Sequence, residues 1–151
     1  MAKIARGRKA KVYINASAYT ASGLIEVRRT KDITLTNEAK TATAEARDLE
    51  YDLSAQAGKT LELTFDRLIE VANDDATDIA ALEASFDNGS DLYVIVARDA
   101  KATASGDALK FVGVVTNMSE TFANGEFAGY SFVIKPSDPD NMPTRVTTPL
   151  A

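Results

Sequence analysis

The segment from Asn73 to Val96, NDDATDIAALEASFDNGSDLYVIV, predicts a capped amphipathic helix that leads directly into a buried strand. Three acidic residues lie where carboxylates favour a helix N-terminus, beside unpaired N–H groups and the positive dipole end: Asp74, Asp75 and Asp78. Three apolar residues recur at helical spacing and share one face: Ile79, Leu82 and Phe86. Asn88-Gly89 then supplies a left-handed C-cap, so the helix is expected over roughly residues 75–88.

The rest of the chain has the alternating pattern of β-strands. Strands are expected over seven ranges: residues 11–14, 24–36, 40–47, 59–69, 92–97, 109–122 and 126–135. A bend or bulge is expected near Arg28–Lys31, where charged residues interrupt the apolar face. About seven strands with a single helix predict a mainly β protein, an antiparallel β-sandwich or barrel with one flanking α-helix.

The 151 residues predict one main domain with two extensions. Residues 11–136 hold the strands and the helix, and residues 1–10 form a basic N-terminal arm. Residues 137–151 are expected to form a proline-rich tail without regular structure, because Pro136, Pro139, Pro143 and Pro149 interrupt strand pairing. No apolar run reaches the roughly 20 residues of a membrane span, and the charged start lacks the apolar core of a secretory signal.

The absence of histidine and cysteine limits the chemistry of the chain. Histidine is the commonest general base near neutral pH and the commonest transition-metal ligand. Without either residue the usual nucleophile triads and zinc sites are impossible. The sequence therefore predicts no catalytic residues, no cofactor and no metal site, and a protein that is not an enzyme.

The charge is unevenly distributed along the chain. The net charge is −5, but residues 1–11 carry five basic residues and no acid, which leaves 12 basic against 22 acidic residues, or −10, for residues 12–151. One interpretation is an arm that binds nucleic acid. The other is an arm that docks on an acidic surface, such as that of an identical neighbour, and the lack of aromatic residues for base stacking favours it.

Three segments resemble the major tail tube proteins of long-tailed, siphovirus-type bacteriophages. Asp32-Ile33-Thr34-Leu35 followed by Ala44-Glu45-Ala46-Arg47 is similar to a paired-strand signature, "D-V-T-L … T-T-R". The helix with its Ser85-Phe86-Asp87-Asn88-Gly89 ending is similar to the pattern "A-A-L-x-x-A-F-x-N-G". Tyr130–Pro136 is similar to the final "S-x-x-L-K-P" strand, so the resemblance extends roughly over residues 10–136.

This resemblance implies a structural virion protein. Such proteins form homo-hexameric rings that stack into a hollow tail tube, through which the genome passes into the host. Expected partners are further copies of the chain, the tail tip, terminator and tape-measure proteins, and DNA in transient, non-specific passage, with no membrane. The expected location is the virion tail, assembled in the host bacterial cytoplasm.

Two surfaces are candidates for this role. An exposed apolar loop suits a head-to-tail contact between rings, and its apolar residues are Leu49, Tyr51 and Leu53. Acidic residues on outward strand positions suit a lumen that must not hold a polyanion, and the candidates are Glu45, Glu62 and Asp66. Two alternatives remain open: the inner tube protein of a contractile injection system, and a ligand- or carbohydrate-binding β-sandwich module.

Overall fold

The computed structural model describes residues 10–19, 23–44, 53–69, 77–98, 108–122 and 128–146, with the backbone alone for residues 42–44 and 53–57. The elements follow the chain in this order: β1 (Lys11–Asn15), β2 (Ile25–Glu26), β3 (Thr30–Ala44), β4 (Leu53–Leu68), α1 (Thr77–Asn88), β5 (Leu92–Ala97), β6 (Ala108–Thr121), β7 (Gly129–Pro136) and β8 (Thr144–Val146). The prediction of a mainly β fold with one helix is confirmed.

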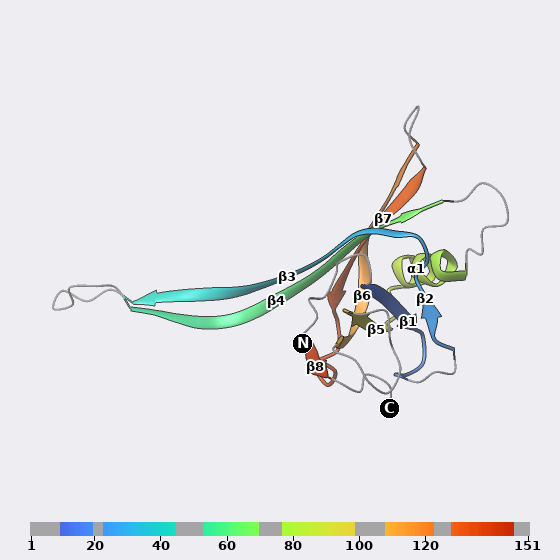
Figure 1. Cartoon of the computed structure of the whole chain (residues 1–151). Helices are drawn as coiled ribbons and strands as arrows, with labels where there is room; N and C mark the ends of the chain where they lie inside the picture. The colour runs from blue at the N-terminus through green and yellow to red at the C-terminus, as the bar shows by residue number, and fades with distance from the viewer. Residues whose placement is uncertain are drawn as a thin grey trace, which may run out of the picture.

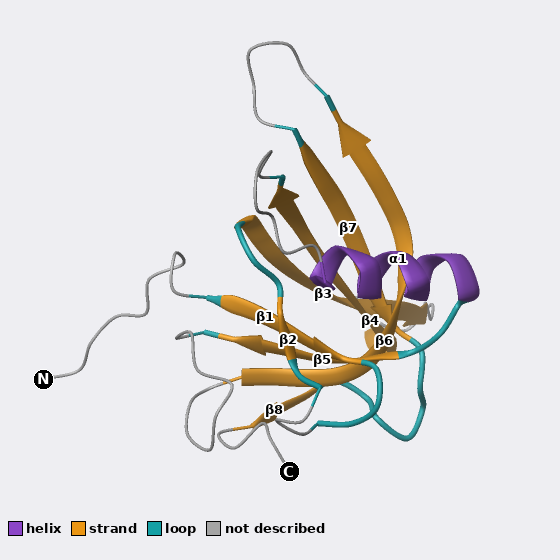
Figure 2. Cartoon of the chain, turned by 90° about the vertical axis from the view of Figure 1, so that its right-hand side faces the viewer, coloured by secondary structure: helices purple, strands orange, loops and turns teal. Residues whose placement is uncertain are grey.

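All strand pairs are antiparallel, and they form one bent sheet in the order β2-β1-β5-β6-β7-β4-β3. The path starts at β2 and ends at β3, so among the described residues the sheet is open and is not a closed barrel. β8 lies off this path and pairs with the first residues of β6. Figure 2 shows β1, β2, β5 and β8 in one part of the sheet, while the far halves of β6 and β7 rise steeply from it.

The core lies on the concave face of the sheet, which α1 also covers. Alternate residues of β4 and β7 point into it, among them Leu63, Phe65, Phe132 and Ile134, all at most 1% exposed. The rings of Phe65 and Phe132 lie 5.6 Å apart. Burial of such side chains contributes about 1.5–3 kcal/mol each.

β5 is buried on both faces, as its sequence predicts. Leu92, Val94 and Val96 join the main core, while Ile95 and Ala97 join a second cluster on the opposite face. Both neighbours of the strand, β1 and β6, pair with it along its whole length. The continuous apolar sequence of β5 therefore reflects its position as a central strand that is covered on both faces.

The helix begins at Thr77 and ends at Asn88, but its buried face differs from the predicted one. Ile79 and Leu82 are buried as expected, whereas Phe86 is 40% exposed. Phe86 shares the angular position of the stripe, but near the end of α1 the residue that packs on the sheet is Ser85, which is 0% exposed and whose hydroxyl accepts a 3.2 Å hydrogen bond from the Val115 N–H of β6. Periodicity gives the direction of a helix face and not which of its residues the sheet covers.

The two predicted strands, residues 24–36 and 40–47, are replaced by the short β2 and the long β3, and β4 begins at Leu53 and not at Lys59. Ser54 to Gly58 are weak strand formers, but they pair with β3 on both sides of a register shift between Lys40 and Thr41, and pairing outweighs propensity. The predicted bulge is confirmed. The register shifts between Lys31 and Thr34, and Arg29 and Asp32 take the positive φ angles of 49° and 52°.

The expectation that no regular structure follows Ser137 is wrong. Thr144–Val146 forms β8 on β6, and the connection to it is held by the hydrogen bonds Ser137 N to Val112 O and Val112 N to Asn141 O. Pro143 precedes the strand, where its missing N–H costs nothing, and β8 is short and lies at a sheet edge. Residues 1–9 and 147–151 lie outside the described residues.

Candidate assembly surfaces

The most prominent surface feature is the hairpin of β3 and β4, which projects from the body (Figure 1). The strands have 15 and 16 residues, yet β4 pairs with β7 only over Leu63–Leu68. Beyond Leu63 the two strands pair only with each other in the part of the chain that the structure describes. Eight residue steps separate Thr36 from Ala44, which at about 3.3 Å each gives a two-stranded extension of roughly 25 Å.

Most of the described side chains of this extension are exposed. Residues Thr36 to Thr41 are exposed without exception, as are Gly58 to Thr60 on the opposite strand. A two-stranded ribbon is marginally stable in water unless a further strand, a helix or another chain packs on it. The hairpin is therefore a surface that requires a partner.

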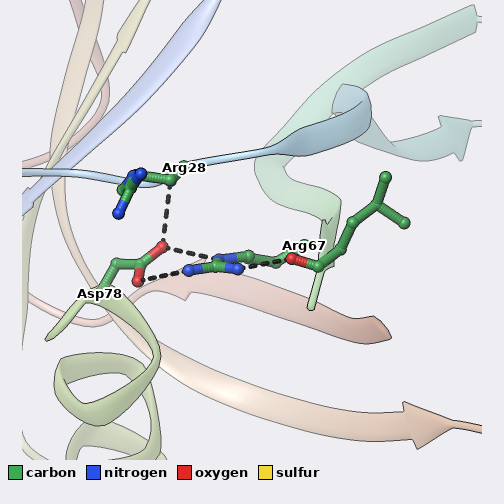
Figure 3. A network of polar contacts seen from close by, with 4 residues as sticks. Arg28, Arg67 and Asp78 are labelled. Atoms are coloured by element: carbon green, nitrogen blue, oxygen red, sulfur yellow. Dashed lines mark hydrogen bonds and ion pairs between the residues drawn. The ribbon is translucent and has the colours of Figure 1, made fainter. Parts of the chain in front are cut away.

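The base of the hairpin is anchored by a buried ion pair (Figure 3). Arg67, near the end of β4, is 0% exposed, and Asp78, in the first turn of α1, is 1% exposed. The Arg67 Nε donates to Asp78 Oδ2 at 3.0 Å, and the Nη2 donates to Oδ1 at 3.2 Å. The backbone N–H of Arg28 also donates to Asp78 Oδ2, at 3.0 Å.

The ion pair joins three segments that are far apart in sequence. It connects the link before β3, the end of β4 and the start of α1, and the Leu68 N–H adds a 3.1 Å bond to the Arg29 carbonyl oxygen. Among the described residues no buried side-chain nitrogen or oxygen atom lacks a hydrogen-bond partner. Removal of either charge would leave the other buried and unpaired, which makes the pair a strong constraint on local geometry.

The face of β4 opposite the core carries two of the predicted lumen acids. Glu62 and Asp66 are half-buried and alternate with the core residues, as predicted from the strand pattern. Glu62 has a basic neighbour, with its Oε2 atom 4.0 Å from Lys135 Nζ, and Asp66 lies opposite Lys31 and Ser131 in the strand register. This face is therefore polar with mixed charges. Glu45, the third candidate, lies outside the described residues.

Of the predicted ring-to-ring residues, Leu49 and Tyr51 lie outside the described residues, and Leu53 is the first residue of β4, described by its backbone only. Leu53 pairs with Ala44, the last residue of β3, at the outermost described position of the hairpin. Elsewhere among the described residues, the exposed large apolar side chains are Phe86, Phe122 and Met142.

Other kinds of site were sought in the same part of the chain. No group of three or more potential metal ligands lies together among the described residues. No helix found there has the length and apolar character needed to cross a membrane.

The chain matches no family model and no curated protein. Solved structures are similar over nearly all of its length. A chain from the tail of an empty gene transfer agent particle, refined with C6 symmetry, has a TM-score of 0.67 and 11% identity, with 95% of this chain and 98% of that chain covered. A chain of the SPP1 tail tube has a TM-score of 0.74 and 6% identity, with 98% and 81% covered.

The chain has the fold of phage tail tube proteins. At these identities the agreement is one of backbone, and it extends over both the sandwich-like body and the strands of the hairpin. A chain of the anti-feeding prophage baseplate is also similar, with a TM-score of 0.68 and 8% identity, and with 97% of this chain and 98% of that chain covered.

Sequence reasoning missed the residues that hold this tail tube fold at the base of its hairpin. A carboxylate at a helix N-terminus is already favourable by itself, so the position of Asp78 does not indicate a buried partner. One signal was present: Arg67 continues the inward positions of Leu61, Leu63 and Phe65, where a charged residue needs a buried counter-ion. The two acids that precede the helix, Asp74 and Asp75, lie outside the described residues.

Proposed function

We propose that this chain is a structural virion protein that assembles into hexameric rings, and that these rings stack into a phage tail tube, the conduit for the genome. The observation that carries the proposal is the β3–β4 hairpin, which projects roughly 25 Å from a body with the tail tube fold and has no further partner strand in the part of the chain that the structure describes. The similarity to a gene transfer agent tail with C6 symmetry supports the six-fold ring.

The role is mechanical and not catalytic. A chain without histidine or cysteine lacks the common nucleophile, base and metal-ligand groups. Partners in the assembly are other copies of the chain, together with tail tip, terminator and tape-measure proteins, and assembly would take place in the host cytoplasm before the tail joins the virion.

Electron microscopy of the purified protein tests the central claim. Hexameric rings and tubes are expected to appear as concentration rises. A protein that stays monomeric at high concentration and at both low and high salt would rule out the tube.

The tip residues Leu49, Tyr51 and Leu53 are proposed as the apolar part of the ring-to-ring contact. The double variant Tyr51→Ala/Leu53→Ala is expected to block tube growth while the monomer keeps its melting temperature, because a buried apolar anchor commonly contributes more than about 1 kcal/mol per copy. Met142→Ala is the matched control, since it shortens an exposed apolar side chain away from the hairpin. If the double variant forms tubes as readily as the parent protein, the ring-to-ring contact lies elsewhere on the chain.

The lumen is proposed to lie on the polar face that carries Glu62 and Asp66, and Glu45, which follows β3 in the sequence, is the third proposed lumen acid. Little affinity for duplex DNA is expected at physiological salt, since phosphate contacts from basic groups supply most non-specific binding. A gel-shift titration should compare the chain with a variant whose Lys3, Arg6, Arg8 and Lys9 are glutamine. Tight, salt-sensitive binding that depends on these four residues would favour a DNA-organising arm instead.

A second candidate is the inner tube of a contractile injection system. It is favoured by the similarity to the anti-feeding prophage baseplate chain and, at a TM-score of 0.52 and 10% identity, to a chain of an extracellular contractile injection system in its sheath–tube complex. Co-expression with a candidate sheath protein discriminates the two, because only this second assembly would carry a sheath.

A further inference from the structure

A shallow cleft of about 530 Å³ lies between β1, β2 and the first turn of α1. Its lining includes the basic residues Lys11, Arg28 and Arg29 and one acidic residue, Glu26. Lys11 forms an ion pair with Glu26, and these two charges cancel. Arg28 and Arg29 therefore leave the lining with a formal charge of +2. Thr77, the first helical residue, also lines the cleft, and the positive end of the helix dipole adds to its potential.

This basic cleft lies on an acidic body. Residues 12–151 carry 12 basic and 22 acidic side chains, so two adjacent arginines at one cleft are unusual for this surface. Arg28 is held in place through its main chain, because its N–H donates to Asp78 at 3.0 Å. That bond uses the backbone and not the guanidinium, so the side chain remains available to a ligand in the cleft. Electrostatic complementarity therefore selects an acidic partner.

The chain itself contains an acidic segment at the place where a partner is needed. The residues between β3 and β4 run from Glu45 to Asp52 and carry four acids and one base, Arg47, for a net charge of −3. Within them the run Asp48-Leu49-Glu50-Tyr51-Asp52, continued to Leu53, alternates three acids with three apolar side chains. The cleft offers basic groups together with the partly buried apolar side chains of Leu24 and Ile25. The two compositions are complementary in both charge and polarity.

The positions of the two surfaces fit a head-to-tail contact. Figure 1 shows the hairpin leaving one side of the body, with β2 and α1 on the opposite side. The outer described ends of β3 and β4 therefore lie far from the cleft of their own chain. They would meet the cleft of a second copy displaced along the direction of the hairpin, and repetition of such a heterologous contact builds an open filament.

We propose that the acidic hairpin tip of one copy docks in the basic cleft of Lys11, Arg28 and Arg29 on a copy in the adjacent ring. This inference rests on the proposed tube and names the surface that receives the hairpin. The arginines pair with the acids of the tip, and the apolar side chains of the tip cover the apolar part of the cleft. The tip thereby obtains the partner that the isolated ribbon lacks.

Charge reversal on each side tests the contact in the full chain. The cleft variant R28E/R29E and the tip variant D48K/E50K/D52K should each raise the protein concentration needed for tube growth by more than about tenfold, because like charges then face each other. Hexameric rings should persist in both variants. Wild-type tube growth should weaken as salt rises from about 0.05 M to about 0.5 M, since screening shortens the range of the interaction.

Mixing supplies the decisive observation. The tip variant retains a basic cleft and the cleft variant retains an acidic tip, so neither stacks on itself. In a mixture of the two, rings alternate and every contact joins opposite charges, so tubes should return. A single chain carrying all five substitutions should likewise form tubes alone.

Arg145→Glu is the matched control, because it reverses one charge on the exposed strand β8, away from the cleft. It should leave tube growth unchanged. If R28E/R29E melts at a lower temperature than the parent, Arg28→Gln replaces it, with an expected rise of about threefold in the critical concentration from loss of one charged contact.

The outcomes separate this inference from the proposed function. Absence of rings and tubes in the wild type would overturn the proposed function itself. Wild-type tubes together with equal growth of R28E/R29E and R145E would leave the tube intact and overturn the docking site. Failure of the mixture to form tubes would also overturn it. Salt-sensitive binding of duplex DNA that R28E/R29E abolishes would assign the cleft to phosphate instead of to the hairpin.

Discussion

Replacement of Asp78 by alanine is expected to remove a large share of the stability of the fold. The substitution leaves the guanidinium of Arg67 charged, fully buried and without its counter-ion. It also removes the acceptor of three N–H groups, two from Arg67 and one from the backbone of Arg28. Arg67 and Asp78 are both buried, so solvent screening does not reduce the cost of the lost interaction.

The magnitude follows from the cost of an unpaired buried charge. Breaking such a pair by deleting one partner commonly costs about 3–5 kcal/mol. Domains of this kind are stable by about 5–15 kcal/mol, so the variant is expected to be marginal. At roughly 2–4 °C per kcal/mol for a chain of this length, the melting temperature should fall by about 6–20 °C.

The assay is urea unfolding of the monomer, at a concentration below that of assembly, followed by circular dichroism. Asp87→Ala is the control, because Asp87 is exposed on the same helix, and its effect should stay within about 0.5 kcal/mol. A double variant with Arg67→Met and Asp78→Leu should recover much of the loss, since an apolar pair needs no counter-ion. A loss below about 1 kcal/mol for Asp78→Ala would refute the reasoning.

Three further predictions concern the helix, a tyrosine and the hairpin. Leu82→Ala should cost about 2–5 kcal/mol in urea unfolding, because Leu82 is 0% exposed, and Phe86→Ala should cost clearly less; equal losses would mean that Phe86 packs in the core. Burial raises the pKa of Tyr19 from 10.0 to about 12, with smaller contributions from Tyr93 and Asp138. The unfolded chain therefore loses this proton first, and stability should fall between pH 10 and about 12, with the Tyr19 signal titrating near 12 in NMR. Amides of residues 36–41 should exchange with solvent rapidly in the monomer and slowly in the tube, and rapid exchange in both would exclude the hairpin from the interface.

The sequence predicted the elements whose burial follows a regular period. The strand from Leu92 to Ala97 was predicted from its continuous apolar run. The helix was predicted from its apolar stripe, its N-terminal acid and its C-terminal Asn-Gly. Both kinds of signal depend only on neighbouring residues in the sequence. The bulge at Lys31–Thr34 was found for the same reason, since charge interrupted the alternation.

The elements that depend on long-range pairing were harder to predict. Residues 53–58 are weak strand formers, and they form a strand only because β3 lies alongside. Thr144–Val146 is likewise a strand because of the free edge of β6. For the candidate surfaces, the alternation of β4 placed Glu62 and Asp66 opposite the core, whereas the partner of Asp78 depends on the approach of a helix and a strand that no local pattern records.

The buried ion pair and the unsupported hairpin have related physical consequences. A ribbon that projects roughly 25 Å acts as a lever, so a small rotation at its base displaces the tip by several ångström. Stacking requires every tip of a ring to reach its neighbour in the same register. Arg67 and Asp78 fix the base where β4 leaves the body, and the same carboxylate holds the backbone of Arg28 beside the basic cleft. One buried carboxylate thus holds both the base of the projecting hairpin and the backbone beside the surface proposed to receive it, which would let a two-stranded ribbon with little stability of its own stack the proposed rings in a single geometry.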